Sequence, residues 1–138
     1  QTVEYAYYVR RNGLTSRVPL SEMQVKSEIA QPERGAVLAA GAPHRVFGAA
    51  WTGSDADIRK VEVSADGGRT WAEAKLLGKP IRGAWRLWEY EWRAPRAGSY
   101  TLMARATDSR GRTQPMERDP DRDNYMINHV MGVPVTLR

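Results

Sequence analysis

The sequence has no cysteine, no long apolar run and only two histidines among its 138 residues. Without cysteine the chain cannot build a disulfide scaffold, a zinc ribbon, a thiolate nucleophile or a Cys-ligated iron–sulfur or molybdenum centre. Its longest apolar runs span a few residues, which excludes a membrane span and a secretory hydrophobic region. No segment repeats its apolar residues with a helical period of 3.6. We therefore expect a domain that is not helical and that binds no cofactor by itself.

Positive charge is concentrated in the middle of the sequence. The chain has 21 Lys and Arg against 16 Asp and Glu, a net charge of +5, and residues 31–114 alone supply this excess. A basic region can attract nucleic acid or another anionic partner. However, no run of Lys or Arg exceeds two residues, and both signs are interspersed. We therefore expect a solvated surface and no nucleic-acid partner.

Short alternating segments separated by turn residues run through most of the chain. Residues 58–64 alternate, with Val61 and Val63 on one face, and Asp66-Gly67-Gly68 supplies a tight turn after them. The clearest predicted strands are residues 46–51, 58–64, 70–76, 85–92, 99–108 and 133–137. Six to eight such strands predict an all-β fold, an immunoglobulin-like (E-set type) antiparallel β-sandwich. An eight-stranded barrel is the alternative.

The first 22 residues differ in texture from the rest. They are rich in tyrosine, could form one short strand, and contain an Asn12-Gly13 turn and the strand breaker Pro19. We interpret residues 1–22 as an N-terminal arm or linker and residues 23–138 as the domain. Because Gln1 is not an initiator methionine, we expect the chain to be a piece of a longer protein.

Residues suited to catalysis or metal binding are scarce. His44 and His129 lie far apart, and neither has an acidic neighbour in sequence, so packing roles are expected for both. Aspartates alternate over residues 119–123 as in a calcium loop, but the glycine and the terminal glutamate of that motif are missing. Nucleophile triads, phosphate loops and dinucleotide glycines are also absent. This chain alone is not expected to be an enzyme.

Five tryptophans fall within 42 residues, at positions 51, 71, 85, 88 and 92. Some must fill the core of a sandwich of this size. The others could bind sugars, stack on nucleotides or bury area against a protein partner. On the predicted strand 85–92, Trp88 and Trp92 share one face and Trp85 lies on the other. One of these faces is a candidate partner surface, and a free-standing carbohydrate- or protein-binding module is one alternative function.

The order of motifs is more specific than the strand pattern. VEVSADGGRTW at residues 61–71 is followed by AWRLW at 84–88, RATD at 105–108, QP at 114–115 and VPV at 133–135. This series resembles the C-terminal dimerisation domain of the sulfite oxidase family of molybdopterin enzymes. The resemblance covers residues 23–137, which is most of the chain.

The resemblance implies a setting that composition does not show. In the family, this immunoglobulin-like domain joins two subunits and follows a catalytic domain that carries the molybdenum cofactor and ligates the molybdenum through one of its cysteines. The parent is then expected to oxidise sulfite, pass electrons to an acceptor such as a cytochrome, and work in the periplasm. The predicted partners of this chain are its own catalytic domain and a second copy in a homodimer. The strand residues expected at the dimer interface are Trp85, Arg86, Trp88, Tyr90 and Trp92.

The resemblance also implies a substrate-binding role for an arginine in the loop before the last strand. Aligning this sequence on Asn128 and on VPV at 133–135 places Asp123 near that position. Arg122, one residue away, is therefore the candidate for holding an anionic substrate, because a guanidinium can pair with two oxygens of an oxyanion. The alternative is that Arg122 neutralises neighbouring aspartates on the surface.

Overall fold

A computed structural model of the chain describes residues 7–11, 14–18, 25–80, 84–116 and 129–138. All regular elements in these ranges are strands. Their bounds are β1 Tyr7–Arg11, β2 Leu14–Val18, β3 Lys26–Gln31, β4 Val37–Leu38, β5 His44–Trp51, β6 Ile58–Ser64, β7 Ala72–Glu73, β8 Lys75–Leu76, β9 Arg86–Trp92, β10 Gly98–Asp108 and β11 Val133–Leu137.

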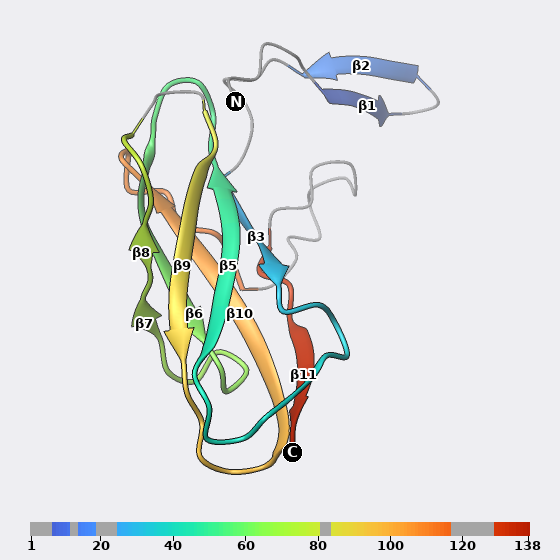
Figure 1. Cartoon of the computed structure of the whole chain (residues 1–138). Helices are drawn as coiled ribbons and strands as arrows, with labels where there is room; N and C mark the ends of the chain where they lie inside the picture. The colour runs from blue at the N-terminus through green and yellow to red at the C-terminus, as the bar shows by residue number, and fades with distance from the viewer. Residues whose placement is uncertain (1–6, 12–13, 19–24, 81–83, 117–128) are drawn as a thin grey trace.

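Two sheets pack face to face (Figure 1). One has the order β4-β11-β10-β6-β7 and the other β3-β5-β9-β8, while β1 and β2 form a separate hairpin. Neighbouring strands are antiparallel except β4 and β11, which are parallel. Each sheet ends in edge strands, so the structure is an open sandwich and not a closed barrel. The predicted immunoglobulin-like sandwich is confirmed.

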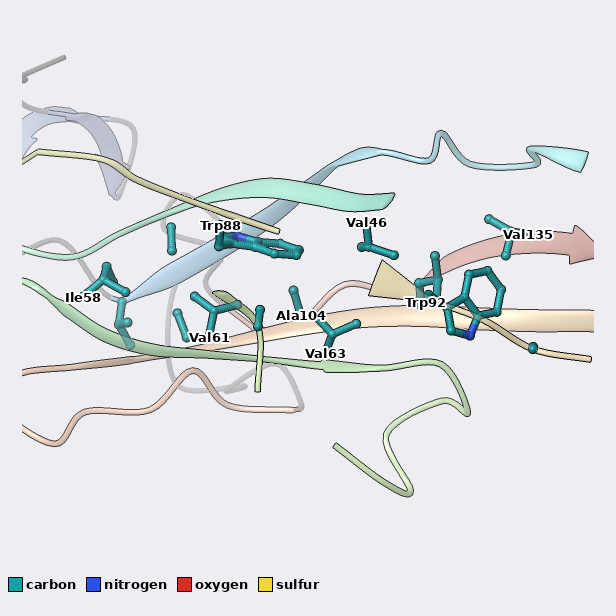
Figure 2. Close-up of a cluster of buried hydrophobic side chains, with 14 of the residues drawn as sticks. Val46, Ile58, Val61, Val63, Trp88, Trp92, Ala104 and Val135 are labelled. Carbon is teal, nitrogen blue, oxygen red and sulfur yellow. The ribbon is translucent and has the colours of Figure 1, made fainter. Parts of the chain in front are cut away.

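The core lies between the inward faces of the two sheets. Figure 2 shows Trp88 and Trp92 of β9 opposite Val61, Val63 and Ala104 of the facing sheet. The buried set comprises Val25, Val46, Ala50, Ile58, Val61, Val63, Ala74, Trp88, Trp92, Ala94, Leu102, Ala104, Ala106, Val135 and Leu137. Alternation along each strand places these residues on one face, as the sequence pattern predicted for residues 58–64 and 99–108.

The strands predicted from alternation correspond to β5, β6, β9, β10 and β11, with end shifts of at most two residues. The predicted strand 70–76 is instead two short strands. β7 pairs with β6 and β8 pairs with β9, so the chain changes sheets at Ala74. The sequence has no turn residue between Ala72 and Leu76 to mark this change of sheet, so the segment reads as one strand. On either side of Asn12-Gly13 the structure has two paired strands, β1 and β2, where one short strand was expected. The predicted boundary between arm and domain, after residue 22, lies outside the described residues.

A network of side-chain hydrogen bonds closes the loop after β6. Asp66 accepts hydrogen bonds from the backbone N–H groups of Arg69 and Thr70 and from the Thr70 hydroxyl at 2.6 Å. The Ser64 hydroxyl accepts from the N–H of Gly68, and Trp71 Nε1 donates to the Gly68 carbonyl. Gly67 and Gly68 have φ values of 74° and 97°, which favour glycine. The SADGGRTW motif is therefore accounted for by loop architecture.

One end of the sandwich is formed where β3 begins and β5 ends. Lys26 of β3 pairs with Trp51 of β5, and Ala50 pairs with Arg86 at the start of β9. β10 ends and β6 begins here too, since Asp108 pairs with Ile58. We call this the proximal end, because the described part of the sandwich begins here, at Val25 and strand β3 (Figure 1). It comprises residues 25–26, 51–58, 84–86 and 108–113.

Candidate functional site

Strand β9, which carries most of the predicted interface residues, presents two different faces. Trp88 is completely buried and Trp92 is 5% exposed, and both belong to the core. Their side chains therefore offer no surface to a partner, and their assignment to the interface has to be revised. Both tryptophans are buried because the space between a five-stranded and a four-stranded sheet must be filled by large side chains, and the even-numbered face of β9 supplies them.

Of the remaining interface candidates, Arg86 and Tyr90 are half-buried and Trp85 is exposed. Arg86 donates from Nε to the Leu77 carbonyl and from a terminal nitrogen to the Gly78 carbonyl, both at 2.8 Å. Its guanidinium thus holds the turn after β8. Tyr90 is partly buried and packs against the core. Trp85, just before β9, is the exposed member of the set, with 44% of its surface accessible.

The outward face of the β3-β5-β9-β8 sheet carries an apolar strip that the sequence pattern did not reveal. Ala49 pairs with Leu87, and Phe47 pairs with Glu89; directly opposed residues share a face. Leu87 is 45% exposed. We define the outer strip as Phe47, Ala49 and Leu87. The odd-numbered positions of residues 44–51, which include Phe47 and Ala49, are the signal in the sequence that indicates it.

Charged side chains of both signs surround the outer strip. Arg45 Nε lies 2.8 Å from Glu89 Oε1, and the Arg45 guanidinium stacks over Phe47 at 4.2 Å from the ring centroid. Register places three cations and three anions on this face, namely Lys26, Arg45, Lys75, Glu28, Glu89 and Glu91. An open groove lies beside them, lined in part by Pro43 and Tyr90. The face is therefore formally neutral on a chain of net charge +5.

At the proximal end, Trp85 stacks on Trp51. The ring centroids are 4.6 Å apart and the planes differ by 19°. Lys26 Nζ lies 5.8 Å from the Trp51 ring centroid, within the range of a cation–π contact. Trp51 is nearly buried, at 8% exposure, while Trp85 stays accessible.

A buried carboxylate joins two loops of the proximal end. Asp108 accepts hydrogen bonds from the Thr52 hydroxyl and Arg112 Nε, both at 2.8 Å, and from backbone N–H groups of Arg110 and Arg112. Arg112 also donates to Asp55 at 2.9 Å. Burial on its own raises the pKa of Asp108, but these hydrogen bonds outweigh it and hold the pKa below its ordinary value. The hydrogen bond from Arg112 lowers the pKa of Asp55 as well.

Replacing Asp108 by asparagine is expected to lower the free energy of unfolding at pH 7 by about 2 kcal/mol, because it removes charge-assisted hydrogen bonds. The folded pKa of Asp108 lies below the unfolded value of about 4. The stabilisation is therefore complete above roughly pH 4 and is lost as the pH falls through the folded pKa. Urea titrations between pH 7 and pH 2 should show a smaller acid loss in Asp108→Asn than in the unmodified chain. Asp57→Asn is the control, since the described hydrogen bonds of Asp57 use its main chain. Identical acid profiles for Asp108→Asn and the unmodified chain would contradict this assignment.

The structure gives no support for a metal site among the residues it describes. The His44 ring lies with Nε2 2.7 Å from the Ala39 carbonyl oxygen and against Trp92. Residues 117–128, which include the alternating aspartates and Arg122, lie outside the described part. A molybdenum centre held by cysteine does not fit this chain, which has none. Within the described ranges, no helix is long and apolar enough to cross a membrane.

Comparison with known proteins identifies the relatives of this chain. The family model described as the Mo-co oxidoreductase dimerisation domain matches residues 17–134. Sulfite oxidase of Gallus gallus is 37% identical over 100 residues, which cover 70% of this chain and 22% of that protein. Mitochondrial sulfite oxidase of Homo sapiens is 36% identical over 102 residues, covering 70% of this chain and 18% of that protein. The chain thus spans about a fifth of the length of these relatives.

A solved structure shows the same fold. The sulfane dehydrogenase SoxCD from Paracoccus pantotrophus matches 92% of this chain and 33% of its own, with a TM-score of 0.67 and 23% identity. These comparisons confirm the resemblance seen in the motif order, and they do not support a free-standing carbohydrate-binding module. The chain belongs to the family of Mo-co oxidoreductase dimerisation domains.

Proposed function

We propose that this domain joins two subunits of a molybdenum-cofactor oxidoreductase through the outward face of the β3-β5-β9-β8 sheet. The observation that carries the proposal is the outer strip, an apolar row on a formally neutral face in which Leu87 is 45% exposed and Phe47 and Ala49 are half-buried. Exposed apolar side chains within a polar rim are typical of protein interfaces. In a family of dimerisation domains, the partner that fits this face is a second copy.

The charge pattern supports a two-fold arrangement. In such a dimer the same patch lies on both subunits. A residue of one copy therefore contacts a second residue of the patch on the other copy, and the same contact is repeated with the copies exchanged. A patch with only cations would repel itself, whereas one with three cations and three anions can pair with its own copy. Trp88 lies inward from this strand and is completely buried. We therefore still assign residues 85–92 to the interface. The contacts are proposed for the outward side chains of this segment, and not for Trp88 and Trp92.

Leu87→Glu is expected to weaken dimerisation at least tenfold, because each subunit would bring a carboxylate into an apolar contact. A tenfold change corresponds to about 1.4 kcal/mol. Sedimentation equilibrium of the 138-residue chain over a range of concentrations measures the effect. Val37→Glu is the matched control, since Val37 is 55% exposed and lies on the other sheet. Equal dimer stability in both variants, or a larger loss in Val37→Glu, would reject this face as the interface.

We further propose that the parent enzyme acts on a sulfur oxyanion such as sulfite, passes its electrons to a cytochrome and works in the periplasm. Sulfite oxidases that are more than 30% identical over most of this chain support the substrate class. The acceptor and the compartment rest on the family resemblance alone. The molybdopterin would be held by the catalytic domain, since this chain supplies no thiolate ligand, and this domain would lie beside the substrate site.

Arg122 is the residue proposed to reach that substrate. Arg122→Ala in the full-length enzyme is expected to raise KM for the anionic substrate tenfold or more, about 1.4 kcal/mol. The guanidinium would pair with two oxygens of the anion and keep its charge at all working pH values. Arg118→Ala, in the same segment, is the control. Unchanged kinetics in Arg122→Ala with normal assembly would leave the domain with a role in assembly alone.

A further inference from the structure

Three arginines gather at the end of the sandwich that lies opposite the proximal end. Arg93 follows β9, Arg96 lies in the turn before β10 and Arg138 follows β11, and all three are exposed. Because Gly98 pairs with Leu137, Arg138 lies beside the turn that carries Arg96. Figure 1 shows the loops of this end meeting at the bottom of the sandwich. We define the distal end as residues 39–43, 93–97 and 138.

Hydrogen bonds join the loops of the distal end to one another. The Gly41 N–H donates to the Ala94 carbonyl at 2.8 Å. The Ala40 N–H donates to the Arg138 carbonyl at 2.9 Å. A terminal nitrogen of Arg93 lies 3.5 Å from the Gly41 carbonyl oxygen. The arginines are therefore carried on ordered backbone, so a partner that pairs with them has only side chains to order.

The distal end carries cations without neighbouring anions. Elsewhere on the sandwich cations form ion pairs, such as Arg45 with Glu89 at 2.8 Å, but the ion pairs among the described residues include none of the three distal arginines. The next acidic residue along β9, Glu91, is opposite Arg45 in the register. Asp66, in the loop after β6, already accepts hydrogen bonds from Thr70. No Asp or Glu occurs in residues 36–44, 92–107 and 129–138.

Carboxylates are the anions that suit this surface best. A guanidinium presents a rigid fork that pairs with both oxygens of a carboxylate, and it stays charged. Binding to duplex DNA commonly rests on about 6–10 phosphate contacts, which is more than three arginines supply. The stacking surface that single strands use is also missing here, since Trp92 is 5% exposed and packs edge-on against Tyr100. Attachment to a membrane surface uses large apolar side chains, whereas the distal loops offer alanine and proline.

We propose that the distal end is a docking surface for a protein partner that presents a cluster of carboxylates. Charge complementarity carries the assignment, because the three cations lie on loops that have no anion of their own. The face of the outer strip differs, since it is formally neutral and fits a second copy. Complementary charges steer two proteins toward each other and raise the rate of association. The proposal does not depend on the dimer interface at Leu87.

Binding of a fluorescein-labelled hexaglutamate peptide to the full-length enzyme tests the proposal. Fluorescence anisotropy compares the unmodified enzyme with a double variant, Arg93→Gln with Arg96→Gln. We expect the double variant to bind the peptide roughly tenfold more weakly at low salt, and the difference to shrink as salt screens the charges. The matched control is Arg59→Gln with Lys79→Gln, which removes two exposed cations outside the distal end. It should weaken binding less than about threefold, because only the net charge changes.

Three results would overturn the proposal. Equal losses in the two double variants would show that the peptide responds only to net charge. No binding of the peptide to the unmodified enzyme at millimolar concentration would show that the distal end does not pair with carboxylates. Tighter binding of duplex DNA, or of vesicles that contain anionic phospholipid, would assign the distal end to another class of partner if it is lost in the Arg93 and Arg96 variant.

Hydrogen exchange followed by mass spectrometry provides a second readout, which locates the bound peptide. In the full-length enzyme the peptide should slow exchange in residues 39–43 and 93–97 and leave the strand around Leu87 unchanged. Slower exchange around Leu87 and not in the distal loops would contradict the proposal. Failure of the dimer interface itself is detected separately, by sedimentation of Leu87→Glu.

Discussion

Trp88→Ala is expected to lower the free energy of unfolding by about 3–5 kcal/mol, the range for removing a large aromatic side chain from a packed core. Trp88 is completely buried and faces the opposite sheet near Val61 (Figure 2). Its removal would leave a cavity that neighbours held in two sheets cannot collapse to fill. Such a loss is a large part of the total stability of a domain of this size.

Urea denaturation followed by far-ultraviolet circular dichroism measures the effect of Trp88→Ala. Leu87→Ala is the control, since Leu87 is the next residue on β9 and is 45% exposed; in the monomer it should cost under about 0.5 kcal/mol. Similar losses in the two variants would show that β9 does not present Trp88 to the core.

The second large effect is expected at Gly48, where a single methyl group does not fit. A Cβ built at this position would overlap the backbone carbonyl oxygen of Glu28 on β3 and lie 2.6 Å from Trp88 Cζ2. The carbonyl belongs to the paired neighbour strand, and the indole is fixed in the core, so neither can move without cost. We expect Gly48→Ala to destabilise the domain by roughly 3 kcal/mol, the upper range for overpacking.

A double-mutant cycle separates the two causes at Gly48. In a Trp88→Leu background the indole contact disappears but the contact with Glu28 remains, so Gly48→Ala should cost less than in the unmodified chain. Ala49→Gly, on the outward face of the same strand, is the matched control for a one-methyl change. A cost for Gly48→Ala below about 0.5 kcal/mol would mean that β3 and β5 are further apart than the structure places them.

The tryptophans show where reasoning from sequence alone is limited. Alternation correctly placed Trp88 and Trp92 on one face and Trp85 on the other, but it could not tell which face is inward. Large apolar side chains lie on both sides of residues 85–92, Trp85 and Leu87 on one side and Trp88 and Trp92 on the other, and only the position of the β4-β11-β10-β6-β7 sheet decides that Trp88 is buried. Leu87 was not predicted as an interface residue, because a single leucine between charged residues has no distinctive pattern in sequence. Its significance comes from Phe47 and Ala49, which register brings beside it.

The short strands give a second example. Residues 70–76 read as one strand because their composition is continuous, yet they leave β6 and join β9 within a few residues. The parallel pair β4–β11 joins residues 37–38 to residues 136–137. Neither contact has a local signal, since both depend on which distant segments the sandwich brings together.

The fold class, the family and the lack of a thiolate ligand for molybdenum can all be read from the amino-acid sequence. They follow from local causes: alternation of period two, glycines that permit positive φ in the Asp66 loop, and an ordered series of motifs. In contrast, the exposure of Trp85, the joining of two loops by Asp108 and the neutral apolar strip on one sheet become visible only in the folded chain. Those properties depend on pairs of residues far apart in sequence, such as Thr52 with Asp108 and Ala49 with Leu87. Their contacts exist only when both sheets have formed, because burial and register are properties of the packed strands and not of any one segment.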